Sequence, residues 1–308
     1  MFSVAREIEA LRDSGAVAAE VALPLIAREK REVVSVYAEL RFLTWAGVML
    51  IVTGVGVLVK NHLDEIGPLA IALGIGAAAA ACYAWAAYKR KREASLVDDY
   101  ILLLAALLLS ADLGYIERTW HLLGANWKEH LLILAVIHGV TAYIFGSRLV
   151  LSVSLTSLAA YLGVQRSLDA IWGSSRYLAR RGFICAAIVL AWRFLDERYR
   201  KESTFTPVFD HYAANLAFWS ALILSADKDL RLLGCLIALG LAAASAAYGF
   251  KIRSEMFLIY ACVYGVIALD VAMVDLIDGL APFFIMTSSM VAIVSLFVIH
   301  AKMRKEEA

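Results

Sequence analysis

Residues 41–92 read RFLTWAGVMLIVTGVGVLVKNHLDEIGPLAIALGIGAAAAACYAWAAYKRKR. Two apolar runs, Phe42 to Val59 and Ile66 to Tyr88, are separated there by a short polar segment. Each run is long enough to cross the roughly 30 Å hydrocarbon layer of a membrane at about 1.5 Å per helical residue. The stretch therefore predicts two membrane helices joined by a turn.

A basic cluster ends this pair of runs. It consists of Lys89, Arg90, Lys91 and Arg92. Lys and Arg close to a membrane span stay on the cytoplasmic side, and short loops with such charges set the orientation of their neighbours. We therefore interpret these four residues as topology-determining.

The composition of the whole chain is that of a membrane protein. Its hydrophobic fraction is 62% and its mean hydropathy is +0.73, both above the values of ordinary soluble domains. The formal net charge is only +1, so no basic field favours binding to nucleic acid. The charges gather in short clusters between apolar runs. We expect an all-α, polytopic integral membrane helix bundle whose surroundings are the lipid bilayer.

The apolar runs divide the chain into three parts. Residues 1–40 predict a cytosolic or interfacial amphipathic helical lead-in, residues 41–301 a transmembrane bundle, and residues 302–308 a cytosolic tail. After the opening pair, eight further runs bring the count to about ten spans. They occupy residues 97–116, 131–145, 149–164, 182–195, 207–226, 230–250, 256–274 and 283–301. Residues 165–181 predict a separate interfacial helix, because four arginines surround their apolar positions.

The basic residues also predict how the bundle is oriented. About ten spans put both termini on one side of the membrane, and most of the 29 basic residues fall on that same side. The first 40 residues contain no apolar core of a cleavable signal peptide. We expect a multi-pass protein of the bacterial cytoplasmic (inner) membrane with both termini in the cytoplasm.

One short sequence occurs twice. Ile71-Ala72-Leu73-Gly74 in the second span recurs as Ile237-Ala238-Leu239-Gly240 in the eighth. The shift of six spans is even, so the copies would share one orientation. This pattern predicts a parallel 4+2+4 internal repeat, in which spans one to four correspond to spans seven to ten.

Ionisable groups inside the spans are the candidate site, because a charge left in hydrocarbon costs at least about 2.5 kcal/mol on insertion scales. Asp112 lies in the third span, His138 in the fourth and Asp270 in the ninth. Tyr115 and Tyr143 belong to the same helices as Asp112 and His138. An acid and an imidazole at matching depth could relay protons or cations. The alternative is hydrogen bonding between helices, which we favour.

No motif predicts an enzyme or a cofactor site. The chain contains no HExxH, no GxSxG and no phosphate-binding glycine loop. Its four cysteines lie inside apolar runs without metal-ligand spacing, so we expect reduced packing residues. We expect no catalytic residue, no cofactor and no metal.

The first half of the chain resembles a family of bacterial membrane proteins, DUF2157, which has no established function. The resemblance rests on a charged helical lead-in containing Leu11 and Gly15, and on a first span with Gly47, Gly54 and Gly56. A polar turn, Lys60-Asn61-His62, follows that span. The family usually has Asn-Trp in this turn, whereas here His62 follows Asn61. The resemblance supplies no catalytic residues.

Three functions remain open at this point. The first is an accessory or scaffold subunit of a membrane complex, with other membrane proteins or a second copy of the chain as partners. The second is a secondary transporter or ion pathway that uses the buried Asp and His residues. The third is a membrane enzyme acting on lipid, for which the loop from Trp120 to His130 is the candidate.

Overall fold

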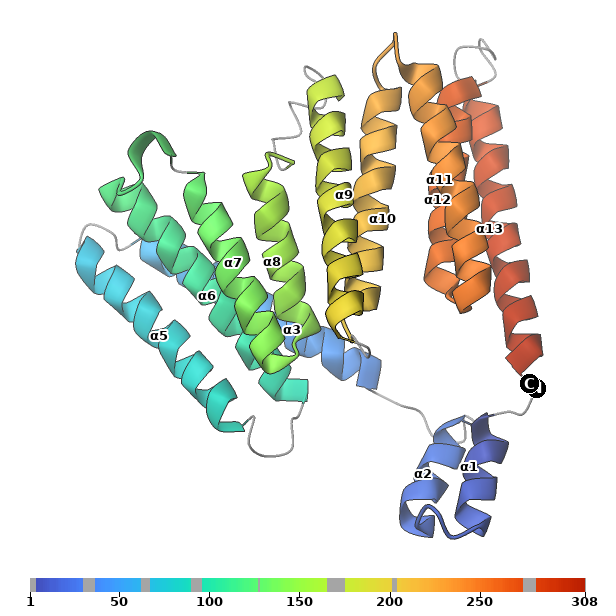
Figure 1. Cartoon of the computed structure of the whole chain (residues 1–308), viewed down its shortest axis with the longest axis horizontal. Coiled ribbons are helices and arrows are strands. Elements are labelled where there is room, and N and C mark those ends of the chain that lie inside the picture. Colours follow the sequence, from blue (N-terminus) through green and yellow to red (C-terminus); the bar gives the residue numbers. More distant parts are fainter. Residues whose placement is uncertain are drawn as a thin grey trace. The chain divides into compact units, whose positions relative to one another are not determined.

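The structure, a computed structural model, describes residues 4–29, 37–61, 67–89, 96–126, 128–164, 175–200, 204–273 and 281–307. Within these ranges the chain is helical and contains no strand, which confirms the predicted fold class at that level (Figure 1). The chain divides into two compact units. One unit combines Met1–Leu40 with Asp229–Ala308, and the other is Arg41–Lys228.

Unit Arg41–Lys228 is a series of helices that pack mainly on their sequence neighbours. The closest pairs are α5 with α6, α7 with α8, and α9 with α10, and α8 also contacts α6 and α10. Short connections place such consecutive helices antiparallel to each other. In order, the elements are α3 (Tyr37–Asn61), α5 (Pro68–Lys89), α6 (Leu96–Trp120), the short 3-10 helix η1 (Gly124–Asn126), α7 (Glu129–Phe145), α8 (Arg148–Tyr161), α9 (Ser175–Tyr199) and α10 (Thr206–Ser225).

The connection between α7 and α8 shows how local sequence sets this arrangement. Gly146 ends α7 in the left-handed region at φ 70° and donates its N–H to the carbonyl of Ala142. Ser147 then caps α8, because its side chain accepts the N–H of Val150 at 3.2 Å. A glycine C-cap followed directly by a serine N-cap reverses the chain within two residues. The break between the predicted runs 131–145 and 149–164 is therefore a tight turn.

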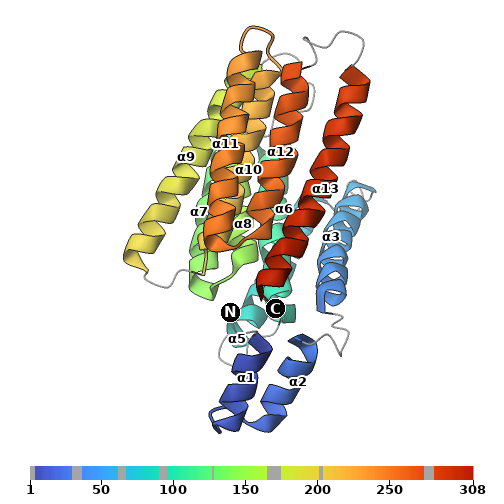
Figure 2. The same ribbon diagram turned by 90° about the vertical axis from the view of Figure 1, so that its right-hand side faces the viewer.

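The other unit contains two groups of helices. α1 (Val4–Asp13) and α2 (Ala19–Glu29) pack on each other, and Gly15 between them has φ 75°. α11 (Arg231–Ile252) packs along α12 (Glu255–Met273), and α13 (Ala281–Glu307) packs on α12 (Figure 2). The hydroxyl of Ser245 in α11 donates to the carbonyl of Phe257 in α12 at 2.8 Å, which joins the two helices directly.

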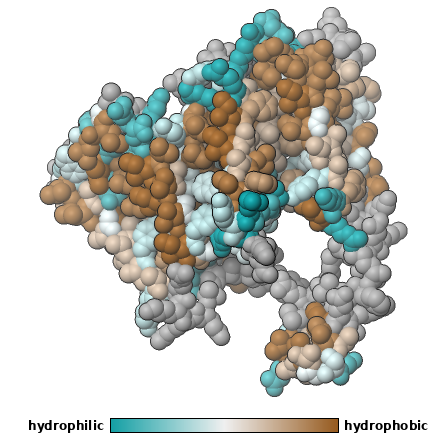
Figure 3. Space-filling view, viewed as in Figure 1, coloured by the Kyte–Doolittle hydropathy of each residue, from teal (hydrophilic) through white to brown (hydrophobic). Residues whose placement is uncertain are grey.

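Ten long helices of the described residues coincide in position with the ten predicted spans. Four of them are long and apolar enough to cross a membrane, namely α5, Val97–Trp120 of α6, α11 and α12. Shorter apolar segments lie at Phe42–Val57, Glu129–Phe145, Arg148–Tyr161 and Pro282–Val298. Hydrophobic side chains cover much of the middle of the helices, and hydrophilic ones gather toward the helix ends (Figure 3). A membrane protein is therefore supported, and the count of ten spans stays a prediction.

The predicted boundary between an interfacial helix and a sixth span at Gly182 is wrong. α9 runs without a break from Ser175 to Tyr199, so Arg176, Arg180 and Arg181 lie on the same helix as the predicted span. Gly182 packs against α10: a Cβ there would lie 2.0 Å from the Ser220 hydroxyl oxygen. The glycine serves close packing inside a continuous helix. Residues 165–174 lie outside the described residues.

Candidate functional site

Asp112 on α6 is a buried carboxylate, only 7% exposed. It lies against Gly76 of α5, where an added Cβ would be 2.9 Å from the Asp112 Oδ2 atom. Its Oδ1 atom is also buried and has no hydrogen-bond partner among the described residues. A glycine at position 76 thus provides the space into which the carboxylate of Asp112 projects.

His138 on α7 is fully buried and joins α7 to α6. Its Nε2 atom lies 2.8 Å from the hydroxyl oxygen of Ser110. That hydroxyl donates to the carbonyl of Ala106 at 2.9 Å, so it accepts a hydrogen bond from Nε2–H of a neutral histidine. In this tautomer the buried Nδ1 atom carries a lone pair, which has no hydrogen-bond partner in the part of the chain that the structure describes. The pair Ser110–His138 is a polar contact between two helices, of a kind common in membrane bundles.

Asp112 and the contact of His138 lie on different faces of α6. Ser110 and Asp112 are two positions apart, which corresponds to roughly 200° around a helix with 3.6 residues per turn. Ser110 faces α7 through His138, whereas Asp112 faces α5 through Gly76. The contacts of the described residues therefore do not join Asp112 and His138 into one relay.

Tyr115 lies on the same side of α6 as Asp112, three positions further along the chain. Its ring packs against the apolar cluster formed by Ile71, Ile75, Ala79 and Leu108. Its hydroxyl is buried and has no hydrogen-bond partner among the described residues. The contact between α5 and α6 thus holds two unsatisfied polar atoms, which is unusual for buried groups.

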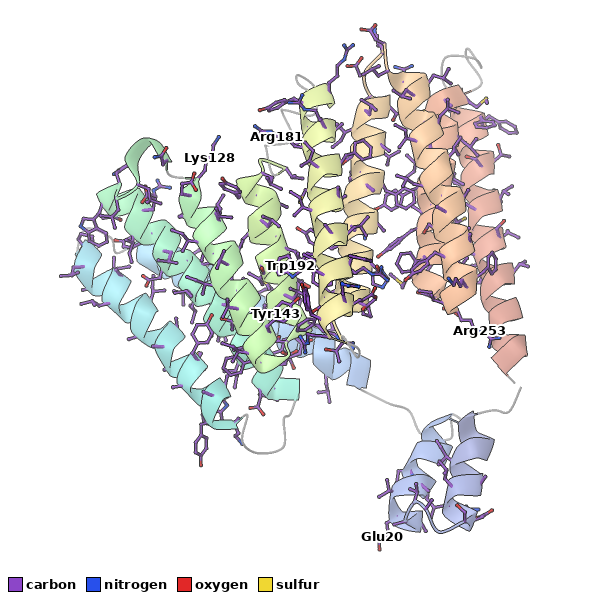
Figure 4. All side chains as sticks on the ribbon, viewed as in Figure 1. Glu20, Lys128, Tyr143, Arg181, Trp192 and Arg253 are labelled. Atoms are coloured by element: carbon purple, nitrogen blue, oxygen red, sulfur yellow. The ribbon has the colours of Figure 1, made fainter. Side chains whose placement is uncertain are left out.

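Tyr143 on α7 belongs to an aromatic cluster. Trp192 of α9 stacks on its ring at 6.3 Å between centroids and donates its indole N–H to the Tyr143 hydroxyl at 3.0 Å (Figure 4). Phe205 meets the same ring edge-on at 5.1 Å, and the Arg200 guanidinium lies 5.3 Å from its centroid. The hydroxyl also interacts with the buried carboxylate of Asp196. This cluster is separate from the contacts of Asp112 and His138.

Asp270 belongs to the other unit. It accepts a hydrogen bond from the Ser288 hydroxyl of α13 at 2.7 Å. Its contact is therefore an interhelical bond within the group α11, α12 and α13. The five candidate residues thus divide among separate helix contacts, and the predicted polar site built from all of them stays untested.

A carboxylate in the last turn of α6 has a partner in the loop that leads to α7. Glu117 is 8% exposed, and its two oxygens lie 3.1 and 3.3 Å from the backbone nitrogen of Leu123. It therefore accepts a backbone N–H and holds the loop closed at the end of α6. His121, in the same loop, is exposed and has φ 49°.

The described residues contain no group of three or more His, Cys, Asp and Glu side chains that could hold a metal ion. The four cysteines are free thiols. Of the topology-determining residues, Lys89 lies at the end of α5, with its Nζ atom 5.5 Å from the centroid of the Trp85 ring. Arg90, Lys91 and Arg92 lie outside the described residues.

The sequence did not indicate the partners of these candidates. A glycine inside an apolar run, such as Gly76, indicates only that helices can approach closely there, whereas in the structure it makes room for the carboxylate of Asp112. Trp192 and Phe205 are far from Tyr143 in the sequence, so only the fold brings them together. The one available signal was the aromatic character of residues near predicted span ends, where Trp and Tyr are common.

Comparison with known families confirms the resemblance of the N-terminal half. The model of the family described as predicted membrane protein (DUF2157) matches residues 9–151. The match runs from the lead-in to the first turn of α8, and it includes Gly76, Asp112 and His138. No curated protein and no solved structure matches the chain.

Proposed function

We propose that this chain is a non-catalytic subunit of a membrane complex, acting as an accessory or scaffold protein. In this proposal it is a multi-pass protein of the bacterial cytoplasmic membrane with both termini in the cytoplasm. Its partners are the lipid bilayer and other membrane subunits or a second copy of the chain. It uses no cofactor.

One observation carries the proposal: several polar groups that lie inside the helices bond a neighbouring helix. His138 bonds Ser110, and Asp270 bonds Ser288. Two buried serines bond backbone carbonyls of neighbouring helices, Ser154 with Ala135 at 2.6 Å and Ser245 with Phe257 at 2.8 Å. Such bonds stabilise a bundle and leave few groups for chemistry.

Transport is the second candidate function, and Asp112 is the observation that favours it. An intramembrane carboxylate with one unpartnered oxygen is typical of ion and proton pathways. The buried lone pair of His138 is a second unsatisfied acceptor. Asp112 projects from one face of α6, however, and His138 contacts another. This arrangement favours the scaffold function over a relay between the two residues.

A lipid-acting enzyme receives less support. The loop from Trp120 to His130 was the candidate site. Its neighbouring carboxylate, Glu117, already accepts the backbone N–H of Leu123. A general acid or base needs to reach substrate. Glu117 instead bonds a backbone N–H of the loop that follows its helix.

Purification of the intact chain in a mild detergent tests the scaffold function. We expect at least one membrane protein to co-purify in a constant ratio that survives repeated washing. The same ratio should be recovered when the partner carries the affinity tag. A chain that purifies alone at every detergent concentration, with every resident membrane complex unchanged after its deletion, would exclude this function.

Cysteine labelling tests the orientation. In a background without the four native cysteines, Ser95→Cys and Ala125→Cys each provide one thiol. An impermeant reagent added to intact cells should label position 125 and miss position 95, because the Lys89–Arg92 cluster stays cytoplasmic. Labelling of position 95 alone would show the opposite orientation.

A further inference from the structure

An apolar groove of about 510 Å³ lies along α7. It is lined by two rows of α7 residues, one with Ala135, Gly139 and Tyr143 and one with Val136, Val140 and Ile144, and by Trp192 of α9. Its volume falls within the roughly 300–1,000 Å³ typical of small-molecule sites. Val136, Val140 and Ile144 are each about half exposed, so the groove is open along its outer side.

Gly139 gives the groove its depth. A Cβ at this position would lie 3.3 Å from the Trp192 ring and 3.2 Å from the Ser154 hydroxyl oxygen. The glycine therefore lets the indole of Trp192 lie directly across α7 and form one wall. The two rows follow i, i+4 spacing, so the groove runs parallel to the helix axis.

The length of the groove matches a single membrane leaflet. Residues 135 and 144 are nine positions apart, which is about 14 Å at about 1.5 Å per residue. The hydrocarbon core is roughly 30 Å thick, so the groove covers about half of it. A lipid acyl chain of one leaflet needs only this half.

A cation lies at one end of the groove. The Arg200 guanidinium is placed over the rings of Tyr143 and Phe205, 5.3 Å from each centroid, and Tyr143 lines the groove. Arg200 is exposed, and among the described residues no carboxylate forms an ion pair with it. The nearby Asp196 is buried and interacts with the Tyr143 hydroxyl. Glu197 is an exposed carboxylate near this end, but it forms an ion pair with Arg193 at 3.1 Å and accepts a hydrogen bond from Thr206, so it leaves the charge of Arg200 available.

A second arginine is fixed to the same segment. Arg148, the first residue of α8, donates its Nε–H to the carbonyl of Thr204 at 2.8 Å. Thr204 directly precedes Phe205, the ring beneath Arg200. Two guanidinium groups thus attach to residues 204–205, beside the end of the groove.

We propose that this groove binds an anionic phospholipid, with one acyl chain along α7 and the headgroup phosphate at Arg200. Basic sites between membrane helices on the cytoplasmic side recognise anionic headgroups in this manner. In the proposed orientation the C-terminal end of α7 faces the cytoplasm. The ligand is then a lipid of the cytoplasmic leaflet, and this binding is independent of the scaffold function.

Lipid retention by the purified full chain tests the proposal. The chain is reconstituted into vesicles with equal phosphatidylglycerol and phosphatidylcholine, extracted in mild detergent and weighed by native mass spectrometry. We expect wild-type protein to retain phosphatidylglycerol preferentially. Arg200→Gln should lower that retention about fivefold, the factor for one basic residue worth about 1 kcal/mol at an anionic surface.

Matched variants separate charge from fold. Arg200→Lys should keep the preference, and Arg198→Gln, which removes an exposed cation two positions earlier at the end of α9, should not change it. Val140→Trp fills the groove and should lower retention of both lipids severalfold, whereas Ile133→Trp, on an exposed position outside the lining, should not. Equal retention by all variants would overturn the proposal. The proposal would also be overturned if Val140→Trp released a co-purifying protein while phosphatidylglycerol stayed bound.

Discussion

The hairpins α5–α6 and α11–α12 share a sequence pattern and differ in one contact. Both are built from helices long and apolar enough to cross a membrane. The first helix of each contains Ile-Ala-Leu-Gly, and the second contains an intramembrane aspartate, Asp112 or Asp270. Two positions after the repeated tetrapeptide, α5 has Gly76 and α11 has Ala242.

The two positions differ by the one methyl group of Ala242, and the aspartates of the two hairpins have different surroundings. Gly76 leaves room for the Asp112 carboxylate, whose Oδ2 atom would lie 2.9 Å from a Cβ there. Ala242 instead meets Gly265 of α12, at 3.3 Å from the Cβ that Gly265 lacks. Asp270 bonds Ser288 of α13. The aspartate at the glycine has an unpartnered oxygen, while the aspartate of the other hairpin has a hydroxyl partner.

The difference shows that a short sequence repeat does not preserve the contacts around it. Asp112 contacts the preceding helix, whereas Asp270 bonds the following one. In an exact structural repeat both would contact equivalent neighbours. The predicted 4+2+4 repeat receives no support from these contacts and stays a prediction.

Closing the space at Gly76 should have the largest effect. We expect Gly76→Ala to lower the free energy of unfolding by about 1–3 kcal/mol relative to Gly74→Ala, because overpacking forces the Asp112 carboxylate to move. Gly74 is the matched control, since no atom outside its own helix neighbourhood lies within 4 Å of its Cβ position. Unfolding in detergent measures both variants. Equal stability of the two would show that Asp112 does not depend on the glycine.

Removing the paired aspartate should have the next largest effect. We expect Asp270→Leu to destabilise the protein by about 0.6 to 2 kcal/mol, the range for one interhelical bond in a membrane bundle. Ser288→Ala should cost a similar amount, and the double variant should cost less than the sum of both. Fully additive losses would mean that the bond between Asp270 and Ser288 contributes nothing.

The reverse change in the second hairpin should have a smaller effect. We expect Ala242→Gly to lower stability by about 0.5–1 kcal/mol, because glycine in a helix interior is entropically unfavourable relative to alanine. The bond between Asp270 and Ser288 should persist, which the same double-variant comparison in the Ala242→Gly background would check. A loss of coupling between these two residues would show that Ala242 does direct Asp270 toward α13.

Removing the unpaired aspartate should cost the least. We expect Asp112→Leu to leave stability unchanged or slightly higher, because the buried Oδ1 atom has no bond to lose and a charge in hydrocarbon is itself unfavourable. The comparison with Asp270→Leu under identical conditions provides the control. A loss as large as that of Asp270→Leu would reveal a partner of Asp112 outside the described residues.

The sequence predicts the positions of the helices well, because hydrophobic runs and polar breaks are local signals. It also predicts the break between residues 145 and 149, where the capping residues Gly146 and Ser147 are adjacent in the chain. It placed the Gly182 boundary wrongly, because a glycine can serve packing against Ser220 as well as end a helix.

The candidate site was harder to predict than the helices. Counting residues from a span end gives the depth of Asp112 and His138, and it gives no information on which neighbour each one faces. That direction depends on the helix that packs on each face of α6, which here is α5 for Asp112 and α7 for Ser110. Contacts such as Trp192 with Tyr143 depend on the fold in the same manner.

Ion flux tests most directly whether the buried polar groups hold helices together or carry ions. The full chain is reconstituted into vesicles that contain a pH-sensitive dye, and a proton gradient and a membrane potential are imposed. We predict that proton flux equals that of protein-free vesicles, and that Asp112→Asn and His138→Gln do not change it. Flux well above that of protein-free vesicles, abolished by Asp112→Asn in a protein that remains folded, would contradict the structural role and establish an ion pathway.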